Sequence, residues 1–118
     1  MEKKYVWHKI ADNISELNFP TSNIIEQTVA GRKVCLVFHA DKLMACSQSC
    51  PHAGGSLAAG YLDASGNIVC PLHRYKFNPQ TGRNVSGEGY YLKTFPCEIR
   101  ADGVFVGFEE NNLFNWLK

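Results

Sequence analysis

The sequence predicts an all-β domain built from antiparallel sheets. Short apolar runs recur along the chain with turn-forming residues between them, and this spacing is typical of strands joined by hairpins and loops. No long stretch repeats its apolar residues with the 3.6-residue period of an amphipathic helix. The length of 118 residues favours one domain, spanning 1–118.

The expected elements follow from these runs and from the turn signals that bound them. The predicted strands are Val6–Ile10, Ile24–Val29, Lys33–His39, Leu43–Ser47, Asn67–Val69, Leu92–Arg100 and Val104–Phe108. Hairpin turns are predicted at Ala30–Arg32 and Ala101–Gly103, where the Asp-Gly pair is the stronger signal. Residues Asp12–Leu17 are expected to form one helical turn with Asp12 as its N-cap.

Two short motifs carry the chemistry that this chain offers. The first is Cys50-Pro51-His52, and the second, after seventeen intervening residues, is Cys70-Pro71-Leu72-His73. Each motif supplies one sulfur and one nitrogen, so together they match a two-iron, two-sulfide cluster with cysteines on one iron and histidines on the other. This is the ligand set of a Rieske centre, with His52 and His73 replacing two cysteines.

The mixed ligand set predicts an electron-transfer centre of relatively high potential. Neutral imidazoles leave the oxidised centre uncharged, whereas four thiolates make it two charges more negative and oppose reduction. Rieske centres accordingly span about −150 to +300 mV, against roughly −400 mV for plant-type ferredoxins.

Other interpretations of the same residues remain open at this point. A zinc site is one, although Cys-x-His is tighter than the usual structural zinc spacings. Another is a coincidental set of Cys and His in a β domain. An all-Cys cluster that uses Cys46, Cys50, Cys70 and Cys97 lacks the plant-type spacing.

The segment CPHAGGSLAAGYLDASGNIVCPLHRYKFNPQTGRNV, which begins at Cys50, resembles the cluster region of Rieske-type ferredoxins that feed ring-hydroxylating dioxygenases. It is also similar to the small subunit of assimilatory nitrite reductase. The resemblance extends over about residues 6–108 and implies that Cys50 and Cys70 hold the inner iron. It implies that His52 and His73 hold the outer iron near the molecular tip.

This resemblance implies a Rieske iron-sulfur fold with two parts. Residues 1–45 and 78–118 are expected to form a base of β-sheet, and residues 46–77 an inserted cluster-binding lobe. The loop Val85–Tyr91 is expected to cover one side of the lobe. Family members often have a proline in this loop, but here it has none.

The chain departs from the Rieske subunits of respiratory complexes at four positions. Gly55 and Leu72 stand where those subunits have a disulfide, and Tyr75 and Phe77 stand where they have a Ser and a Tyr that bond cluster sulfurs. Because hydrogen bonds to sulfur stabilise the reduced cluster, their loss predicts a potential near the low end of the Rieske range.

The function we expect is one-electron transfer without substrate chemistry of its own. The donor would be an NAD(P)H-dependent flavoprotein reductase and the acceptor a terminal oxygenase. The alternatives are a small subunit of a multi-subunit reductase such as nitrite reductase, and a non-redox zinc-binding β module. His8 and His39 are not expected to form a mononuclear-iron triad, and 118 residues are not expected to include a second, catalytic domain.

Composition excludes several other classes of partner. A net charge of +1 without a basic stripe predicts no nucleic-acid binding. The N-terminus has no apolar signal region, and no apolar run approaches membrane-spanning length, so a cytoplasmic protein is expected.

The remaining distinctive residues are expected to have structural or docking roles. Cys35 and Cys97 are predicted to be buried structural thiols. Basic residues near the second motif are expected to be solvated or to form a docking rim. They are Arg74, Lys76 and Arg83. The aromatic tail 113–118 is expected to pack back on the base sheet or to form a partner contact.

Overall fold

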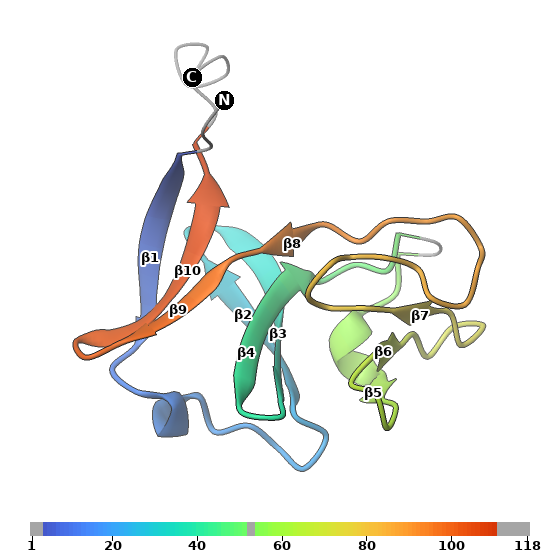
Figure 1. The fold of residues 1–118 in the computed structure, drawn as a ribbon, viewed down its shortest axis with the longest axis horizontal. Coiled ribbons are helices and arrows are strands. Elements are labelled where there is room, and N and C mark those ends of the chain that lie inside the picture. Colours follow the sequence, from blue (N-terminus) through green and yellow to red (C-terminus); the bar gives the residue numbers. More distant parts are fainter. Residues whose placement is uncertain (1–3, 52–53, 111–118) are drawn as a thin grey trace.

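The computed structural model describes residues 4–51 and 54–110, and it confirms the all-β prediction. The described residues form three antiparallel sheets (Figure 1). The first has the order β1-β10-β9 and consists of Tyr5–Ala11, Gly103–Glu109 and Cys97–Arg100. The second has the order β2-β3-β4-β8 and consists of Ile24–Val29, Arg32–His39, Lys42–Ser47 and Thr94–Phe95. The third, β5-β6-β7, consists of Tyr61–Leu62, Ile68–Val69 and Lys76–Phe77.

The second sheet lies between two hydrophobic cores, and strand β3 shows this most clearly. Four consecutive residues, 34–37, have no exposed surface. Val34 and Leu36 face the core shared with the first sheet, whereas Cys35 and Val37 face the core shared with the third sheet. A strand buried on both faces is apolar without alternation. The prediction that Cys35 is a buried thiol is therefore confirmed.

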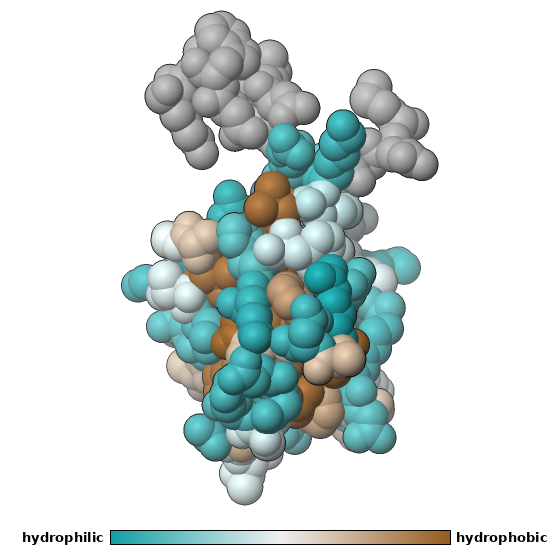
Figure 2. Space-filling model, turned by 90° about the vertical axis from the view of Figure 1, so that its left-hand side faces the viewer, coloured by the Kyte–Doolittle hydropathy of each residue, from teal (hydrophilic) through white to brown (hydrophobic). Residues whose placement is uncertain are grey.

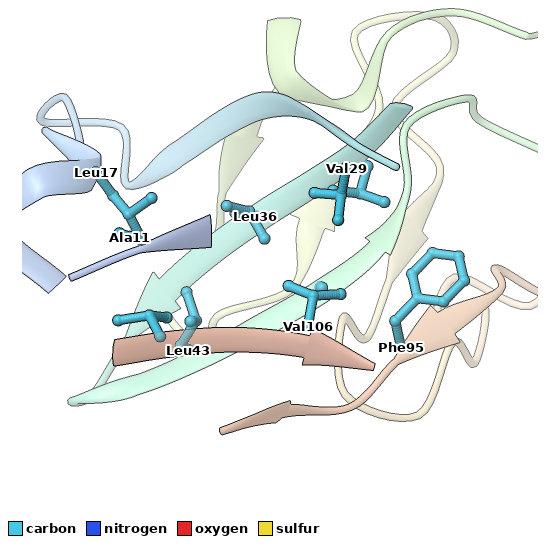
Figure 3. Close-up of a cluster of buried hydrophobic side chains, with 10 residues drawn as sticks. Ala11, Leu17, Val29, Leu36, Leu43, Phe95 and Val106 are labelled. Atoms are coloured by element: carbon cyan, nitrogen blue, oxygen red, sulfur yellow. The ribbon is translucent and has the colours of Figure 1, made fainter. Parts of the chain in front are cut away.

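The core between the first two sheets anchors the base of the fold. Figure 3 shows side chains from both sheets and from the short helix converging there. They include Ala11, Leu17, Val29, Leu36, Leu43, Phe95 and Val106. At about 25 cal/mol per Å² of apolar surface, burial of this kind is the main favourable term in folding. The first sheet's outer face is largely hydrophilic, with hydrophobic side chains between the polar ones (Figure 2).

The predicted strand Leu92–Arg100 is wrong as a single element. It is divided into β8 (Thr94–Phe95) and β9 (Cys97–Arg100), which belong to different sheets. Pro96 lies between them and has no N–H to donate to a ladder, so the chain changes sheets at this residue. Cys97 follows directly and is only half-buried, less enclosed than predicted, although burial still raises the pKa of its thiol to about 12.

The helical turn forms as a 3-10 helix, Ile14–Leu17, but its cap differs from the prediction. Asn13 rather than Asp12 is the N-cap, and its Oδ1 accepts a hydrogen bond from the Glu16 N–H. Glu16 reaches back to accept a bond from the Asp12 N–H. This reciprocal arrangement resembles a capping box with its cap one residue later in the chain.

The other strand predictions are confirmed to within one or two residues, except that β5 and β7 were not predicted. Both missed strands have two residues, too few to give a periodic signal. A second 3-10 helix, Leu57–Ala59, was also not predicted. The hairpin turn at residues 30–31 is confirmed, with Ala30 and Gly31 in left-handed conformations. The boundaries of the cluster-binding lobe, 46–77, stay a prediction.

Candidate metal centre

Cys50, the first residue of the first motif, follows strand β4 and is tied to residues 54 and 55 by backbone hydrogen bonds. The Cys50 N–H donates to the Gly55 carbonyl and the Gly54 N–H donates to the Cys50 carbonyl, both at 2.8 Å. Gly54 has a φ of +73°, where a side chain would add strain. The loop therefore holds the Cys50 side chain inward, with 2% of the residue exposed. His52, the other predicted ligand of this motif, lies outside the described residues.

The second motif lies in a loop between β6 and β7. The Cys70 N–H donates to the Tyr75 carbonyl at 2.8 Å, which closes the loop, and Cys70 has no exposed surface. His73 and Arg74 follow with φ values of +65° and +58°, a left-handed pair that non-glycine residues seldom adopt. This turn leaves His73 exposed while Cys70 points into the core. Strained backbone of this kind is concentrated at functional sites.

The two loops bring Cys50 and Cys70 together in the core beneath the third sheet. Burial raises the pKa of the Cys70 thiol, the Leu72 N–H lowers it, and the neighbouring Cys50 thiol raises it further, so that the net pKa is above its ordinary value. A neutral Cys70 thiol is therefore favoured while no cation is bound nearby. Thiolates in this place call for a compensating positive charge, which is what a metal centre supplies.

The loops also approach each other at Gly55 and Leu72, the two positions that hold disulfide-forming cysteines in the Rieske subunits of respiratory complexes. A Cβ atom at Gly55 would lie 2.8 Å from the Leu72 Cδ1 atom, so the leucine fills the space next to the glycine. Apolar packing between the loops therefore occupies the position of the missing covalent brace. Leu72 itself is 44% exposed, so this contact lies at the surface.

These features fit an iron-sulfur cluster with mixed ligands. Two buried thiols approach one another from separate loops, and an exposed imidazole, His73, follows three residues after one of them. Cys35 and Cys46 face each other across strands β3 and β4 and belong to the same core. The Cys35 side chain and burial both raise the pKa of Cys46, which suits a buried structural thiol. Within residues 4–51 and 54–110, no group of three or more His, Cys, Asp or Glu converges as an alternative metal site.

Aromatic side chains surround the second motif. Phe77 is fully buried in the same core as Cys50 and Cys70. The Tyr75 ring lies 6.3 Å from the His73 ring between centroids, so it packs beside the imidazole. Tyr90, from the predicted covering loop, extends this row with its ring 5.9 Å from that of Tyr75.

The sequence does not predict the polar network in the covering loop. Its centre is Asn84, which is only 8% exposed and forms hydrogen bonds within the loop and to Lys76. The sequence around it, Arg83-Asn84-Val85-Ser86-Gly87, has the composition of a solvated turn, so nothing in the pattern distinguishes a buried asparagine.

The basic residues near the second motif differ in their surroundings. Lys76 lies 3.8 Å from Asp63, whose Oδ1 accepts hydrogen bonds from the backbone of Ser65 and Asn67. Arg74 and Arg83 are exposed. The interaction of Lys76 with Asp63 leaves the two arginines as the more available charges of the proposed rim.

Comparison with known proteins identifies the family of this chain. Residues 7–96 match the model of the Rieske [2Fe-2S] domain. A ferredoxin component of the naphthalene 1,2-dioxygenase system from Pseudomonas aeruginosa is 26% identical over 99 residues, covering 83% of this chain and 94% of that protein. A 3-phenylpropionate/cinnamic acid dioxygenase ferredoxin subunit from Photorhabdus laumondii is 29% identical over 76 residues, covering 63% of this chain and 72% of the relative.

Solved structures share the fold of this chain. The ferredoxin chain in a complex of oxygenase and ferredoxin of carbazole 1,9a-dioxygenase superposes with a TM-score of 0.73 at 26% identity, covering 92% of this chain and 98% of that one. A nitrite reductase small subunit from Mycobacterium tuberculosis has a TM-score of 0.77 at 16% identity, covering 92% of this chain and 99% of that one, and this likeness shows the shared fold alone. Because the family model spans most of the sequence, the chain belongs to the Rieske [2Fe-2S] domain family, and its cofactor is a Rieske-type [2Fe-2S] cluster.

Proposed function

We propose that this protein is a one-electron carrier that passes electrons from an NAD(P)H-dependent flavoprotein reductase to a terminal oxygenase. The observation that carries the proposal is the pairing of two buried thiols, Cys50 and Cys70, next to an exposed histidine, His73. A centre with its sulfur ligands buried and an imidazole at the surface can exchange electrons without admitting a substrate.

The proposed ligands are Cys50, His52, Cys70 and His73. When bound, the cluster supplies reversible one-electron chemistry. The two cysteines would hold it on the core side, where Leu57, Ile68 and Phe77 exclude water. The two histidines would hold it on the other side, and His73 is well placed there because its loop turns it towards solvent.

The partner assignment rests on the relatives and on the surface near the centre. The ferredoxin relatives are named as components of dioxygenase systems, and this chain covers 94% of the naphthalene dioxygenase ferredoxin. Exposed Arg74 and Arg83 near the second motif suit a partner with acidic residues beside its own redox group. Charges of this kind mainly raise the rate of encounter.

Reconstitution with candidate partners tests this function. The purified protein should carry two irons and two labile sulfides per chain and should be reduced by a flavoprotein reductase with NADH or NADPH. The reduced protein should then support turnover of a terminal oxygenase at a rate that depends on carrier concentration. Iron-containing protein that no flavoprotein reductase reduces would contradict the proposed donor.

The alternative of a permanent reductase subunit is distinguished by solution behaviour. A subunit held beside a flavin and a sirohaem needs a large apolar interface, so the isolated chain would associate or aggregate. A monomer at micromolar concentration favours the mobile carrier. The non-redox zinc module is disfavoured by the family match, and colourless protein with one zinc per chain would restore it.

The cellular location stays a prediction. Across the part of the chain that the structure describes, no helix is long and apolar enough to cross a membrane. We propose a cytoplasmic protein that binds neither nucleic acid nor lipid, in keeping with its net charge of +1.

A further inference from the structure

Asn84 is the single buried polar or charged side chain among the residues that the structure describes, and it lies in the long connection between β7 and β8. A buried amide is unfavourable unless its donors and acceptor are satisfied. This connection arches over the end of the molecule farthest from the first sheet (Figure 1). It contains the covering loop, which lacks a stiffening proline. The position of the loop therefore needs another physical cause.

The Asn84 amide forms hydrogen bonds to strand β7 and to other residues of the covering loop. Its Nδ2 group lies 3.0 Å from each of three acceptors, the Lys76 carbonyl, the Ser86 Oγ and the Glu88 Oε1. Its Oδ1 accepts a longer bond, 3.4 Å, from the Tyr90 N–H. An amide nitrogen has two hydrogens, so three acceptors share two donors.

Neighbouring bonds reinforce this network. The Val85 N–H donates to the Lys76 carbonyl and the Lys76 N–H donates to the Ser86 Oγ, both at 2.9 Å. The Ser86 hydroxyl also donates to the Glu88 carboxylate. Lys76 lies three residues after His73, so the network fixes the loop to the strand that follows the second motif.

The loop places Tyr90 at the end of a row of aromatic rings. Tyr90 packs against Tyr75 at 5.9 Å between ring centroids, and Tyr75 packs against His73 at 6.3 Å. The Tyr75 carbonyl also accepts the hydrogen bond from Cys70 that closes the second loop. A change in the loop would therefore alter the surroundings of a proposed ligand without touching it.

We propose that Asn84 is a positioning residue, which holds residues 85–90 so that Tyr90 packs on Tyr75, beside the exposed His73, and limits how closely water can approach the cluster from this side. This inference rests on the proposed function, because it takes His73 as a ligand. It assigns to a hydrogen-bonded amide the rigidity that a proline would otherwise give to this loop. If this packing is lost, water can approach the centre more closely, and the more negative reduced state gains more from solvation than the oxidised state. The reduction potential should then rise.

The experiment compares Asn84→Leu, Tyr90→Ala and the double variant with wild-type protein by voltammetry. Leucine has a similar volume, adds no charge and removes every hydrogen bond of the amide. Tyr91→Ala is the matched control, since Tyr91 is adjacent to Tyr90, is 75% exposed and has no ring contact among the aromatic pairs found in the described residues. Hydrogen exchange at the Val85 and Tyr90 amides reports whether the loop is held.

Both single variants should shift the potential upward by similar amounts, and the double variant should add little, because they act through the same contact. In Asn84→Leu, hydrogen exchange at the Val85 amide should be at least tenfold faster, whereas Tyr91→Ala should leave the potential and the exchange rate unchanged.

A lower melting temperature for Asn84→Leu at an unchanged potential would overturn the proposal and leave a purely structural role. An unchanged potential in Tyr90→Ala would also overturn it, even if Asn84→Leu fails to fold. Iron content of the wild type separates this result from failure of the proposed function, and Val85 exchange still tests the loop if no iron binds.

Discussion

Gly82 is a position where adding one methyl group should destabilise the protein strongly. A Cβ atom there would lie 1.9 Å from the Leu92 carbonyl oxygen, whereas ordinary carbon-oxygen contacts begin near about 3.3 Å. Its φ of +78° is also unfavourable for any residue with a side chain. The contact atom is backbone, and the Leu92 N–H donates to the Gly82 carbonyl at 2.8 Å, so the two segments cannot separate without losing that bond.

The expected cost of Gly82→Ala is the sum of three effects. The left-handed conformation costs about 1 kcal/mol, the strained or lost hydrogen bond about 1 kcal/mol, and the overpacking about 1–3 kcal/mol. The total is about 3–5 kcal/mol, which is a large part of the roughly 5–15 kcal/mol that stabilises a typical domain.

Gly31→Ala is the matched control for this prediction. Gly31 has nearly the same φ, +81°, but a Cβ atom added there would have no other atom within 4 Å, so only the conformational cost of about 1 kcal/mol applies. At about 4 °C per kcal/mol, the two variants should differ by roughly 8–16 °C in apparent Tm. The assay is thermal unfolding of cluster-loaded protein at one scan rate, since cluster loss makes unfolding irreversible. Equal losses in the two variants would refute the steric argument.

Two further variants and one labelling experiment test the electrostatics and packing of the protein. Burial raises the pKa of Asp63, but hydrogen bonds from Asn67 and the Ser65 N–H, together with Lys76, outweigh this and leave the pKa below its ordinary value. Wild type should therefore be more stable than Asp63→Asn above about pH 4 and should lose that advantage as the pH falls through the lowered pKa of Asp63. A difference in unfolding midpoints that does not change with pH would contradict this prediction. Phe77→Tyr should raise the reduction potential if the new hydroxyl reaches a cluster sulfur, so an unchanged potential in a folded variant would argue against that contact. Burial raises the pKa of Cys97 to about 12, so alkylation of the native protein at pH 8 should leave this thiol largely unmodified, and rapid labelling of Cys97 without unfolding would contradict it.

The sequence was most informative where strong local patterns coincide with burial. Strand β2 was predicted with its observed bounds, and β3 within one residue, because β-branched residues in β2, a continuous apolar run in β3 and the turn between them leave few alternatives. The single predicted strand at 92–100 was wrong because the apolar pattern continues through Pro96 while the hydrogen-bonding partner changes. Strands of two residues such as β5 and β7 depend on tertiary pairing and carry no periodic signal.

In the candidate site, too, local motifs could be predicted and tertiary contacts could not. The two motifs predicted the ligand chemistry, because Cys and His at those spacings match few other centres. The contact between Gly55 and Leu72 and the burial of Asn84 could not be predicted, since both depend on how two distant loops approach each other. The left-handed pair at His73 and Arg74 was also missed, because neither residue type indicates it.

Nitrogen hyperfine coupling in the reduced protein tests the central claim most directly. Pulsed electron paramagnetic resonance should detect two directly coordinated imidazole nitrogens, with a rhombic spectrum whose average g value is lower than that of an all-Cys cluster. Labelling histidine with ¹⁵N should change both couplings, and His73→Cys should remove one of them if a cluster still assembles. A reduced cluster without nitrogen coupling would show that cysteines alone bind the irons, and the assignment of His52 and His73 would then be wrong.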